Sequence, residues 1–388
     1  MTKKLHDKHY DSSKKLHTEI KHLLFHNTLK TSVGKASALS SSYVYLDLFA
    51  GDGTFKDGSF GSPIIALKEF SSYLSGDNKR NKRPPKLKTV ECGLCEKHGK
   101  ENLIKNLSTL SLNPAVSYSV FGDWEEAEGN LRSIKRKSSY GFIFADQFAT
   151  ELNLRKFIDF VGKDKHDFLI FYNPQALLRL KGRGIYKHIS TVTGVSLEAV
   201  MRADKENFKS FILNSLRKNL RELRDFVVFA AIPNTRGNKL TWSDYFYLAL
   251  GTNDPHVADA FVQAYEKAVE KYRIFYRIPG SLFFEDKKRE FKEFIFLVVR
   301  GFFQRHKRPI DLRLLYLVVT FNLLSWKDAV SYDTVIPTMR NVREALNRLR
   351  KEGKIKISGP EGTLKKDGDL KSGILSLARF KQIYIFPT

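Results

Sequence analysis

A short apolar run that ends in a glycine turn constrains the fold more than any other feature of this chain. Residues 43–49, Tyr-Val-Tyr-Leu-Asp-Leu-Phe, have the aromatic and β-branched character of a strand. The run breaks at residues 50–54, Ala-Gly-Asp-Gly-Thr, where the glycines permit the backbone angles of a tight turn. A helix is predicted to follow from about residue 62 to 73. This order predicts the first βα unit of a parallel sheet.

The same pattern recurs along the first two thirds of the chain. Further strands are predicted at 89–94, 117–120, 141–145 and 167–171, with helices near 99–110 and 125–134. Alternating strands and helices imply a parallel sheet that is covered on both faces. Residues 226–232 and 245–250 then predict a hairpin. A hairpin that closes such a sheet is typical of a class I methyltransferase, so the predicted fold class is α/β and Rossmann-like.

The 388 residues are too many for one typical core, and the sequence changes character along its length. We predict a basic N-terminal helical segment over 1–42, the methyltransferase domain over 43–255, a helical connector over 256–305 and a winged-helix-like module over 306–388. In the last part, a helix is predicted from 335 to 351, followed by strands that can form a wing. A helical dimerisation or packing module is the alternative for this region.

The charge balance favours a polyanionic partner. Lysine and arginine number 66 against 42 acidic residues, which gives a net charge of +24. Nucleic acid, RNA or DNA, is therefore the expected partner; the alternative is that the lysines serve solubility alone. No apolar run reaches the roughly 18 residues of a membrane-spanning helix, and the N-terminus lacks the apolar stretch of a signal peptide. We expect a cytoplasmic protein without a membrane partner.

The two cysteines, Cys92 and Cys95, limit the chemistry of the chain. No second pair is present to complete a four-ligand zinc site, so no metal is expected. Both cysteines fall in a predicted buried strand and are expected to pack there. Methylation at carbon 5 of cytosine requires a cysteine nucleophile, and neither cysteine follows the fourth strand, which argues against that reaction.

Acidic residues follow the predicted strands in the order that an S-adenosylmethionine site requires. The glycine turn allows close approach of the backbone to the ligand. Glu96 follows the second strand and can accept hydrogen bonds from both ribose hydroxyls, and Asp123 after the third strand can accept from the adenine amino group. Trp124 can cover the adenine ring. The predicted cofactor-binding residues are Asp47, Phe49, Ala50, Gly51, Gly53, Glu96, Asp123 and Trp124.

A second set of residues is predicted to meet the substrate. Asp146 follows the fourth strand and can orient the target group, with Gln147 and Phe148 beside it. Gln147 offers a donor and an acceptor to a base edge, or it caps a turn. The predicted catalytic residues are Asp146, Gln147, Phe148 and Asn173, and the predicted substrate-binding residues are Arg179, Arg340, Arg343 and Arg350.

Residues 45–63, from Tyr-Leu-Asp-Leu-Phe-Ala-Gly to Phe-Gly-Ser-Pro, resemble the three-Cys-motif partner proteins. The resemblance extends over about residues 12–255 and includes Glu96-Lys97 and Gly122-Asp123. It implies a class I methyltransferase-like fold, S-adenosylmethionine as cofactor and a partner protein. The family has Asp-Pro-Phe-Gly where this chain has Asp-Gln-Phe-Ala at 146–149, which puts an amino-methyltransferase mechanism in doubt.

Two functions are consistent with these residues. The first is a methyltransferase that acts on nucleic acid, RNA somewhat ahead of DNA, at a base nitrogen or a ribose oxygen. The intact glycine turn, Glu96 and Asp123 favour it. The second is a nucleic-acid-binding protein that kept the fold, lost methyl transfer and works with a partner protein. The altered step at Asp146-Gln147 favours the second.

Overall fold

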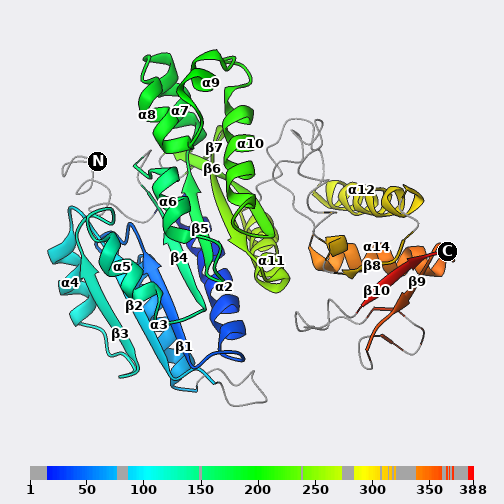
Figure 1. Ribbon diagram of the computed structural model, residues 1–388, viewed down its shortest axis with the longest axis horizontal. Coiled ribbons are helices and arrows are strands. Elements are labelled where there is room, and N and C mark those ends of the chain that lie inside the picture. The colour runs from blue at the N-terminus through cyan, green and yellow to red at the C-terminus, as the bar shows by residue number, and fades with distance from the viewer. Residues whose placement is uncertain are drawn as a thin grey trace. The chain divides into compact units, whose positions relative to one another are not determined.

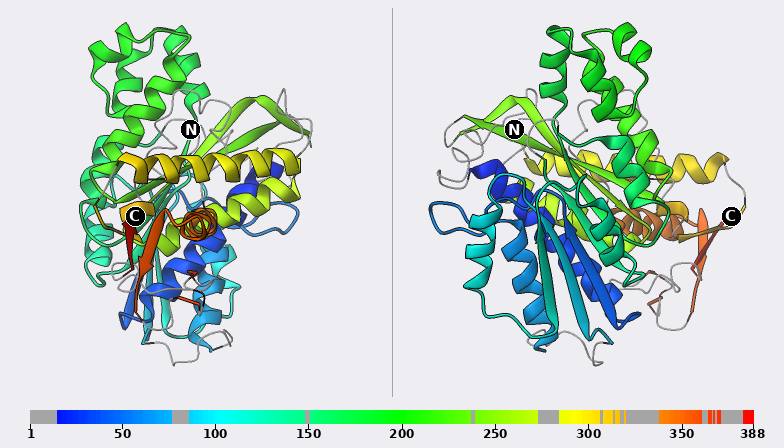
Figure 2. Two further views of the ribbon diagram at one scale, coloured as in Figure 1. Left: turned by 90° about the vertical axis from the view of Figure 1, so that its right-hand side faces the viewer. Right: turned by 60° about the vertical axis from the view of Figure 1, so that its left-hand side comes forward.

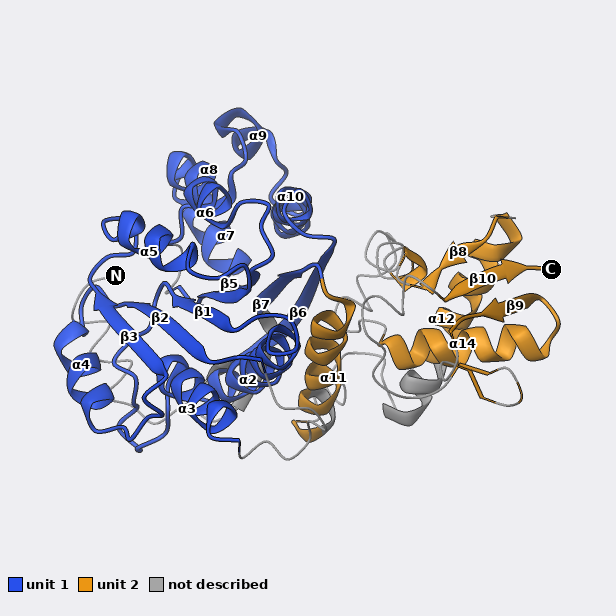
Figure 3. Ribbon diagram, turned by 60° about the horizontal axis from the view of Figure 1, so that its bottom comes forward, with its two compact units in different colours: residues 1–253 blue, residues 254–388 orange. Residues whose placement is uncertain are grey.

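The computed structural model divides the chain into two compact units, Met1–Asn253 and Asp254–Thr388, which Figure 3 shows in different colours. The structure describes residues 15–76, 86–147, 151–236, 239–272, 284–305, 308–312, 314–316, 319, 338–360, 364–365, 367, 369–370 and 383–388. No helix among these residues is long and apolar enough to cross a membrane.

The first unit is built on a seven-stranded sheet with the order β3-β2-β1-β4-β5-β7-β6 (Figure 1). Strands β1 to β5 are parallel, and β7 is antiparallel to both β5 and β6. This arrangement is the Rossmann-like class I methyltransferase sheet with a closing antiparallel hairpin, so the predicted fold class is confirmed. The strands are β1 Ser42–Asp47, β2 Thr89–Cys95, β3 Val116–Phe121, β4 Gly141–Ala145, β5 Asp167–Tyr172, β6 Phe226–Arg236 and β7 Lys239–Thr252.

Side chains alternate across the sheet as the two-residue period of a strand requires. Tyr43 and Tyr45 of β1 point to one face, where their rings meet Phe70 of helix α3. Val44 and Leu46 point to the other face and join a cluster with residues of α5, α6, α8 (Tyr186–Thr193) and α10 (Phe208–Arg221). The helices are α3 Ser62–Leu74, α4 Lys100–Ser108, α5 Glu128–Lys135 and α6 Leu154–Val161.

Helix α2, Leu16–Ala36, is part of the first unit's core. Phe25 is fully buried and stacks on Phe144 of β4, with 4.4 Å between the ring centroids. Ser32 donates a 2.6 Å hydrogen bond to Asp167 at the start of β5. The described part of the predicted N-terminal segment 1–42 therefore packs on the sheet as one layer with α3.

Four helices lie between β5 and β6 and form a lobe beyond the carboxyl ends of the parallel strands (Figures 1 and 2). This helical lobe consists of α7 Pro174–Gly182, α8 Tyr186–Thr193, α9 Leu197–Arg202 and α10 Phe208–Arg221. Ile189, Val200 and Ile212 are fully buried and join it to the sheet's core cluster. The lobe is therefore a fixed part of the first unit at the edge where ligands of open α/β sheets bind.

The second unit combines helices with a small antiparallel sheet of order β8-β10-β9. Helix α14 begins after Thr338, which forms a capping box with Asn341, and buries the predicted apolar face of Val342, Ala345, Leu346 and Leu349. The predicted residues 335–337 lie outside the described part of the chain. The elements are α11 Pro255–Lys271, α12 Phe284–Arg305, β8 Ile310–Asp311, α14 Met339–Lys351, β9 Ile355–Ser358 and β10 Tyr384–Pro387. Helices α11 and α12, predicted as a connector, belong to this unit.

Gly251 is required where β7 passes Phe168 of β5. A Cβ atom at Gly251 would lie 2.0 Å from Cζ of the buried Phe168 ring. We expect Gly251→Ala to lower the free energy of unfolding by about 1 to 3 kcal/mol, measured by urea denaturation, because overpacking displaces a core ring. The control is Gly129→Ala in α5, where an added Cβ meets no atom within 4 Å. Equal stability of the two variants would contradict the prediction.

Candidate active site at the carboxyl edge of the sheet

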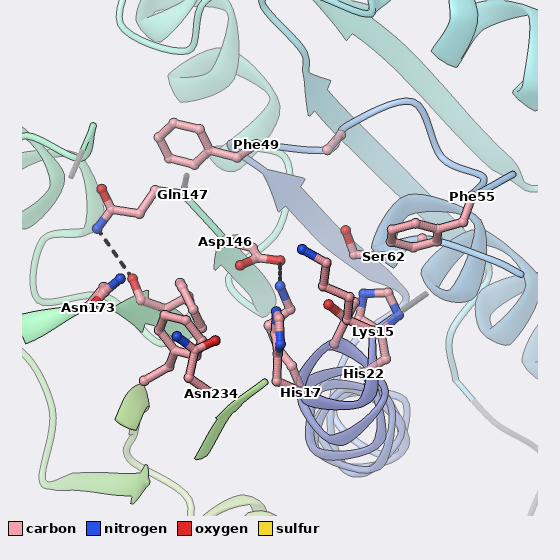
Figure 4. Close-up of a pocket in the computed structure, with 16 residues that line it drawn as sticks. Lys15, His17, His22, Phe49, Phe55, Ser62, Asp146, Gln147, Asn173 and Asn234 are labelled. Carbon is pink, nitrogen blue, oxygen red and sulfur yellow. Dashed lines mark hydrogen bonds and ion pairs between the residues drawn. The ribbon is translucent and has the colours of Figure 1, made fainter. Parts of the chain in front are cut away.

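Two cavities open at the carboxyl ends of the parallel strands, and Phe49 lines both. The first cavity, of about 440 Å³, is lined by Leu48, Phe49, Cys95, Glu96, Lys97, His98, Gly122, Asp123, Trp124, Glu125, Glu126, Glu151 and His188. The second, of about 260 Å³, is lined by Lys15, His17, Thr18, Lys21, His22, Phe49, Ala50, Phe55, Gly61, Ser62, Asp146, Gln147, Phe171, Asn173, Asn234 and Phe246 (Figure 4). The predicted cofactor and catalytic residues thus fall mainly into two adjoining sites.

The glycine turn after β1 has the positive φ angles of the tight turn that its sequence predicts. Gly51 and Gly53 have φ angles of 66° and 83°, which residues with a Cβ rarely adopt. A Cβ at Gly53 would also lie 3.2 Å from the side chain of Leu103. Gly51 and Gly53 line neither cavity; they shape the turn that presents Phe49 and Ala50.

Glu96 ties the first cavity to the glycine turn. Its Oε2 accepts a 2.9 Å hydrogen bond from the backbone N–H of Gly51, and its Oε1 accepts from those of His98 and Gly99 at 2.7 and 2.9 Å. The side chain is buried at the cavity wall. These charge-assisted bonds fix the carboxylate and hold the turns after β1 and β2 together.

Asp123 follows β3 and lines the first cavity. Its carboxylate accepts 2.8 Å hydrogen bonds from Lys97 and from the backbone N–H of Glu125. Burial raises the pKa of Asp123, but these donors outweigh that effect and hold the pKa below its ordinary value. Trp124 lines the same cavity but is almost fully buried, with its ring edge-on to Phe160.

Asp47 occupies a different position from the other predicted cofactor residues. It is fully buried at the end of β1 and lines neither cavity. Tyr45 and Ser62 donate hydrogen bonds to its Oδ2 at 2.9 and 2.8 Å. Burial raises the pKa of Asp47 to about 7 despite these donors. The carboxyl group thus links β1 to the start of α3 through hydrogen bonds beside the glycine turn.

The raised pKa of Asp47 predicts a pH-dependent stability. A buried acid whose pKa is raised stabilises the fold below its unfolded pKa near 4, and this contribution is lost as the pH rises through about 7. Asp47→Asn removes this titration. We therefore expect the free energy of unfolding of the variant, relative to that of wild type, to be higher at pH 8 than at pH 5 by roughly 2 to 4 kcal/mol. Urea denaturation at both pH values measures this. A stability difference that does not change with pH would contradict the prediction.

Asp146 directly follows β4 and lines the second cavity together with residues of helix α2. It forms an ion pair with Lys21, which Figure 4 marks with a dashed line. Both side chains are mostly buried, and the Lys21 Nζ atom lies 4.9 Å from the centroid of the Phe171 ring. The structure thus brings the predicted catalytic carboxylate into the cavity together with a cation from the N-terminal helix.

The other predicted catalytic residues and Arg179 do not all lie at the second cavity. Gln147 lines the second cavity, but its amide donates to the Phe171 carbonyl at 3.3 Å and accepts from the Leu152 N–H. Asn173 lines the cavity and caps α7 by accepting from the Ala176 N–H at 3.1 Å. Arg179 is exposed on α7 and lines neither cavity. Phe148 lies outside the described residues.

The arginines of α14 are engaged with carboxylates of their own unit. Arg340 pairs with Glu344 at 3.0 Å, and Arg350 pairs with Asp369 at 2.7 Å. Arg343 acts on the half-buried Asp259: burial raises the pKa of that carboxyl, and Arg343 partly counters the rise. These three side chains belong to the second unit and form part of its internal electrostatics.

Sequence reasoning did not identify several residues that line the cavities. Lys21 and His17 come from α2, and His188 comes from α8 of the helical lobe. Helical periodicity indicated α2 but not which strand ends it approaches. Phe171 and Phe246 occupy strands β5 and β7, where they look like core residues in the sequence; their rings lie 5.0 Å apart at the second cavity.

No protein-family model and no curated protein matches the chain. Among solved structures, a Legionella pneumophila protein of family DUF519 aligns at 14% identity and a TM-score of 0.38, covering 70% of this chain and 96% of that chain. Human methyltransferase-like protein 13, in complex with SAH, aligns at 8% identity and a TM-score of 0.30, covering 70% and 99%. The strand order and the antiparallel seventh strand, rather than these alignments, assign the fold.

Proposed function

We propose that the protein is an S-adenosylmethionine-dependent methyltransferase that acts on nucleic acid, RNA ahead of DNA, at a base nitrogen or a ribose oxygen. The observation that carries the proposal is the pairing of the two cavities. Glu96 and Asp123 line the first, Asp146 lines the second, and Phe49 lies between them. A cofactor site and a substrate site that share one wall are what transfer between two bound molecules requires.

The residues of the first cavity fit a nucleoside with a charged tail. The fixed carboxylate of Glu96 suits ribose hydroxyls, and Asp123 suits an exocyclic amino group, because both are hydrogen-bond acceptors. Phe49 offers an apolar surface on the side of the second cavity. When bound, S-adenosylmethionine would supply an electrophilic methyl group.

The second cavity has the side chains that a base or sugar needs. Phe171 and Phe246 offer aromatic surface, which suits base stacking. Asn173 and Asn234 bring amide groups to the same cavity, which suit a base edge (Figure 4). Asp146, fixed by Lys21, would orient the target group and accept its proton or a hydrogen bond from it.

The net charge of +24 supports a polyanionic substrate. The antiparallel sheet and helix α14 of the second unit are consistent with the proposed winged-helix module, which would add contacts to nucleic acid or to a partner protein. The resemblance of residues 45–63 to three-Cys-motif partner proteins supports a place in that family and a partner protein. The expected location is the cytoplasm.

A second candidate is a nucleic-acid-binding protein that has lost methyl transfer. The bonds of Gln147 favour it, because both the donor and the acceptor of its amide contact backbone atoms rather than the cavity. The ion pair between Asp146 and Lys21 also has to admit the target group before Asp146 can act.

Mass spectrometry of modified nucleosides distinguishes the two candidates. RNA and DNA from cells with and without the gene are digested and compared, and the purified protein is incubated with labelled S-adenosylmethionine and nucleic acid from the deficient cells. The enzyme proposal predicts one modified nucleoside that disappears in the deficient cells and is restored in vitro. Cofactor binding without any such nucleoside would support the second candidate.

A further inference from the structure

We propose that the turn between α7 and α8 binds the phosphodiester backbone of the nucleic acid whose base or sugar enters the second cavity. This phosphate-binding turn is defined as residues 179–187. The inference rests on the proposed function for its substrate, but it concerns a surface that the cofactor site does not include.

Three cations project from this short segment. Arg179, Arg183 and Lys187 are exposed, and none of them forms an ion pair with a carboxylate in the part of the chain that the structure describes. Lys181 lies in the same segment but donates to the carbonyls of Val200 and Met201. Cations that neutralise phosphates displace the counterions condensed on the nucleic acid, and this release supplies most of the non-specific affinity.

The backbone of the turn also suits close contact with a phosphate. Gly182 and Gly184 carry no side chains, and Gly184 has a φ of 74°, which closes the turn after α7. A Cβ at Gly182 would meet no atom within 4 Å, so the backbone there is open to solvent. Phosphate contacts from backbone N–H groups beside arginine and lysine are common in nucleic-acid complexes.

The position of the turn links it to both cavities. Asn173, the N-cap of α7, lines the second cavity, and His188, directly after Lys187, lines the first. The helical lobe that carries the turn lies at the carboxyl edge of the sheet (Figures 1 and 2). A nucleic-acid strand whose target nucleotide occupies the second cavity therefore passes beside the lobe.

The arginines of α14, which the sequence suggested for phosphate contacts, are less suited to this role. Arg340 and Arg350 are paired with Glu344 and Asp369, and Arg343 interacts electrostatically with Asp259. A phosphate would have to displace these carboxylates, and the gain from each contact would be smaller. The observations therefore favour the α7–α8 turn over α14.

The test compares two variants of equal charge in the full-length protein. The first carries Arg179→Gln, Arg183→Gln and Lys187→Gln. The matched control carries Lys205→Gln, Lys209→Gln and Lys218→Gln, three lysines of the same lobe that lie outside the turn. Binding of a short fluorescein-labelled single-stranded RNA, and of a DNA duplex, is measured by anisotropy over a range of salt concentrations.

We expect the turn variant to bind RNA at least about tenfold more weakly and to reduce the slope of log K against log salt by about 2, since three phosphate contacts are lost. The control should change the slope by less than half of that. Equal changes in both variants, or no nucleic-acid binding by the wild type, would overturn the inference. A selective loss in the DNA arm alone would support the turn as a phosphate-binding surface and would overturn its preference for RNA.

Calorimetry with S-adenosylmethionine keeps this inference separate from the proposed function. The turn variant should bind the cofactor as wild type does, because its three residues line neither cavity. Selective loss of RNA binding in a protein that shows no methyl transfer would leave the turn assignment in place and remove the enzymatic activity.

Discussion

Asp146→Asn is expected to keep the fold and cofactor binding while lowering the rate of methyl transfer about 100-fold or more. The substitution preserves the shape of the side chain but removes the charge that orients the target group and accepts its proton. Transfer from labelled S-adenosylmethionine to RNA measures the rate, and calorimetry measures cofactor binding.

The ion pair at this site requires a second variant, because Asp146→Asn leaves the buried Lys21 ammonium without its counterion. The double variant Lys21→Met/Asp146→Asn removes both charges together. It is expected to restore any stability lost in the single variant but not its activity. Wild-type turnover in either variant would remove Asp146 from the mechanism and leave Gln147 and Asn173, which line the same cavity, as candidates.

Glu96→Ala is expected to weaken S-adenosylmethionine binding by about 1.5 to 3 kcal/mol, which corresponds to roughly 10- to 150-fold in Kd. Two effects add. The variant loses the acceptor for the ribose, and it releases the N–H groups of Gly51, His98 and Gly99, which shape the cavity wall. Calorimetry on the folded variant measures the loss.

Two further variants separate these effects. Glu96→Gln keeps an acceptor oxygen and should fall between wild type and Glu96→Ala. Glu101→Ala removes an exposed carboxylate of α4 that lies outside the cavity and should bind as wild type does. Tight binding by Glu96→Ala would show that the cofactor does not contact this carboxylate.

The sequence predicts the sheet well because its information is local. Each parallel strand is a short apolar run, and each acidic residue after a strand is placed by the rule that ligands bind at the carboxyl edge. Glu96, Asp123 and Asp146 all reach this edge. Asp47 follows the same pattern but is buried beneath the glycine turn, because Tyr45 and Ser62 hold it there.

Contacts between distant segments are what the sequence does not reveal. The ion pair of Lys21 with Asp146 depends on how α2 crosses the sheet, and no local pattern encodes that crossing. The arginines of α14 look like a nucleic-acid surface in the sequence, but Arg350 pairs with Asp369 from a later segment of the chain. The α7–α8 turn is identified by the exposure of its three cations and by the absence of ion pairs to them among the described residues, which residue type alone does not show.

Titration of the wild-type protein with S-adenosylmethionine in a calorimeter tests the central claim most directly. The two-cavity arrangement predicts saturable binding to one site per chain that Glu96→Ala weakens and Asp146→Asn leaves unchanged. Absence of binding to correctly folded wild-type protein would contradict the assignment of the first cavity and, with it, the proposed methyltransferase.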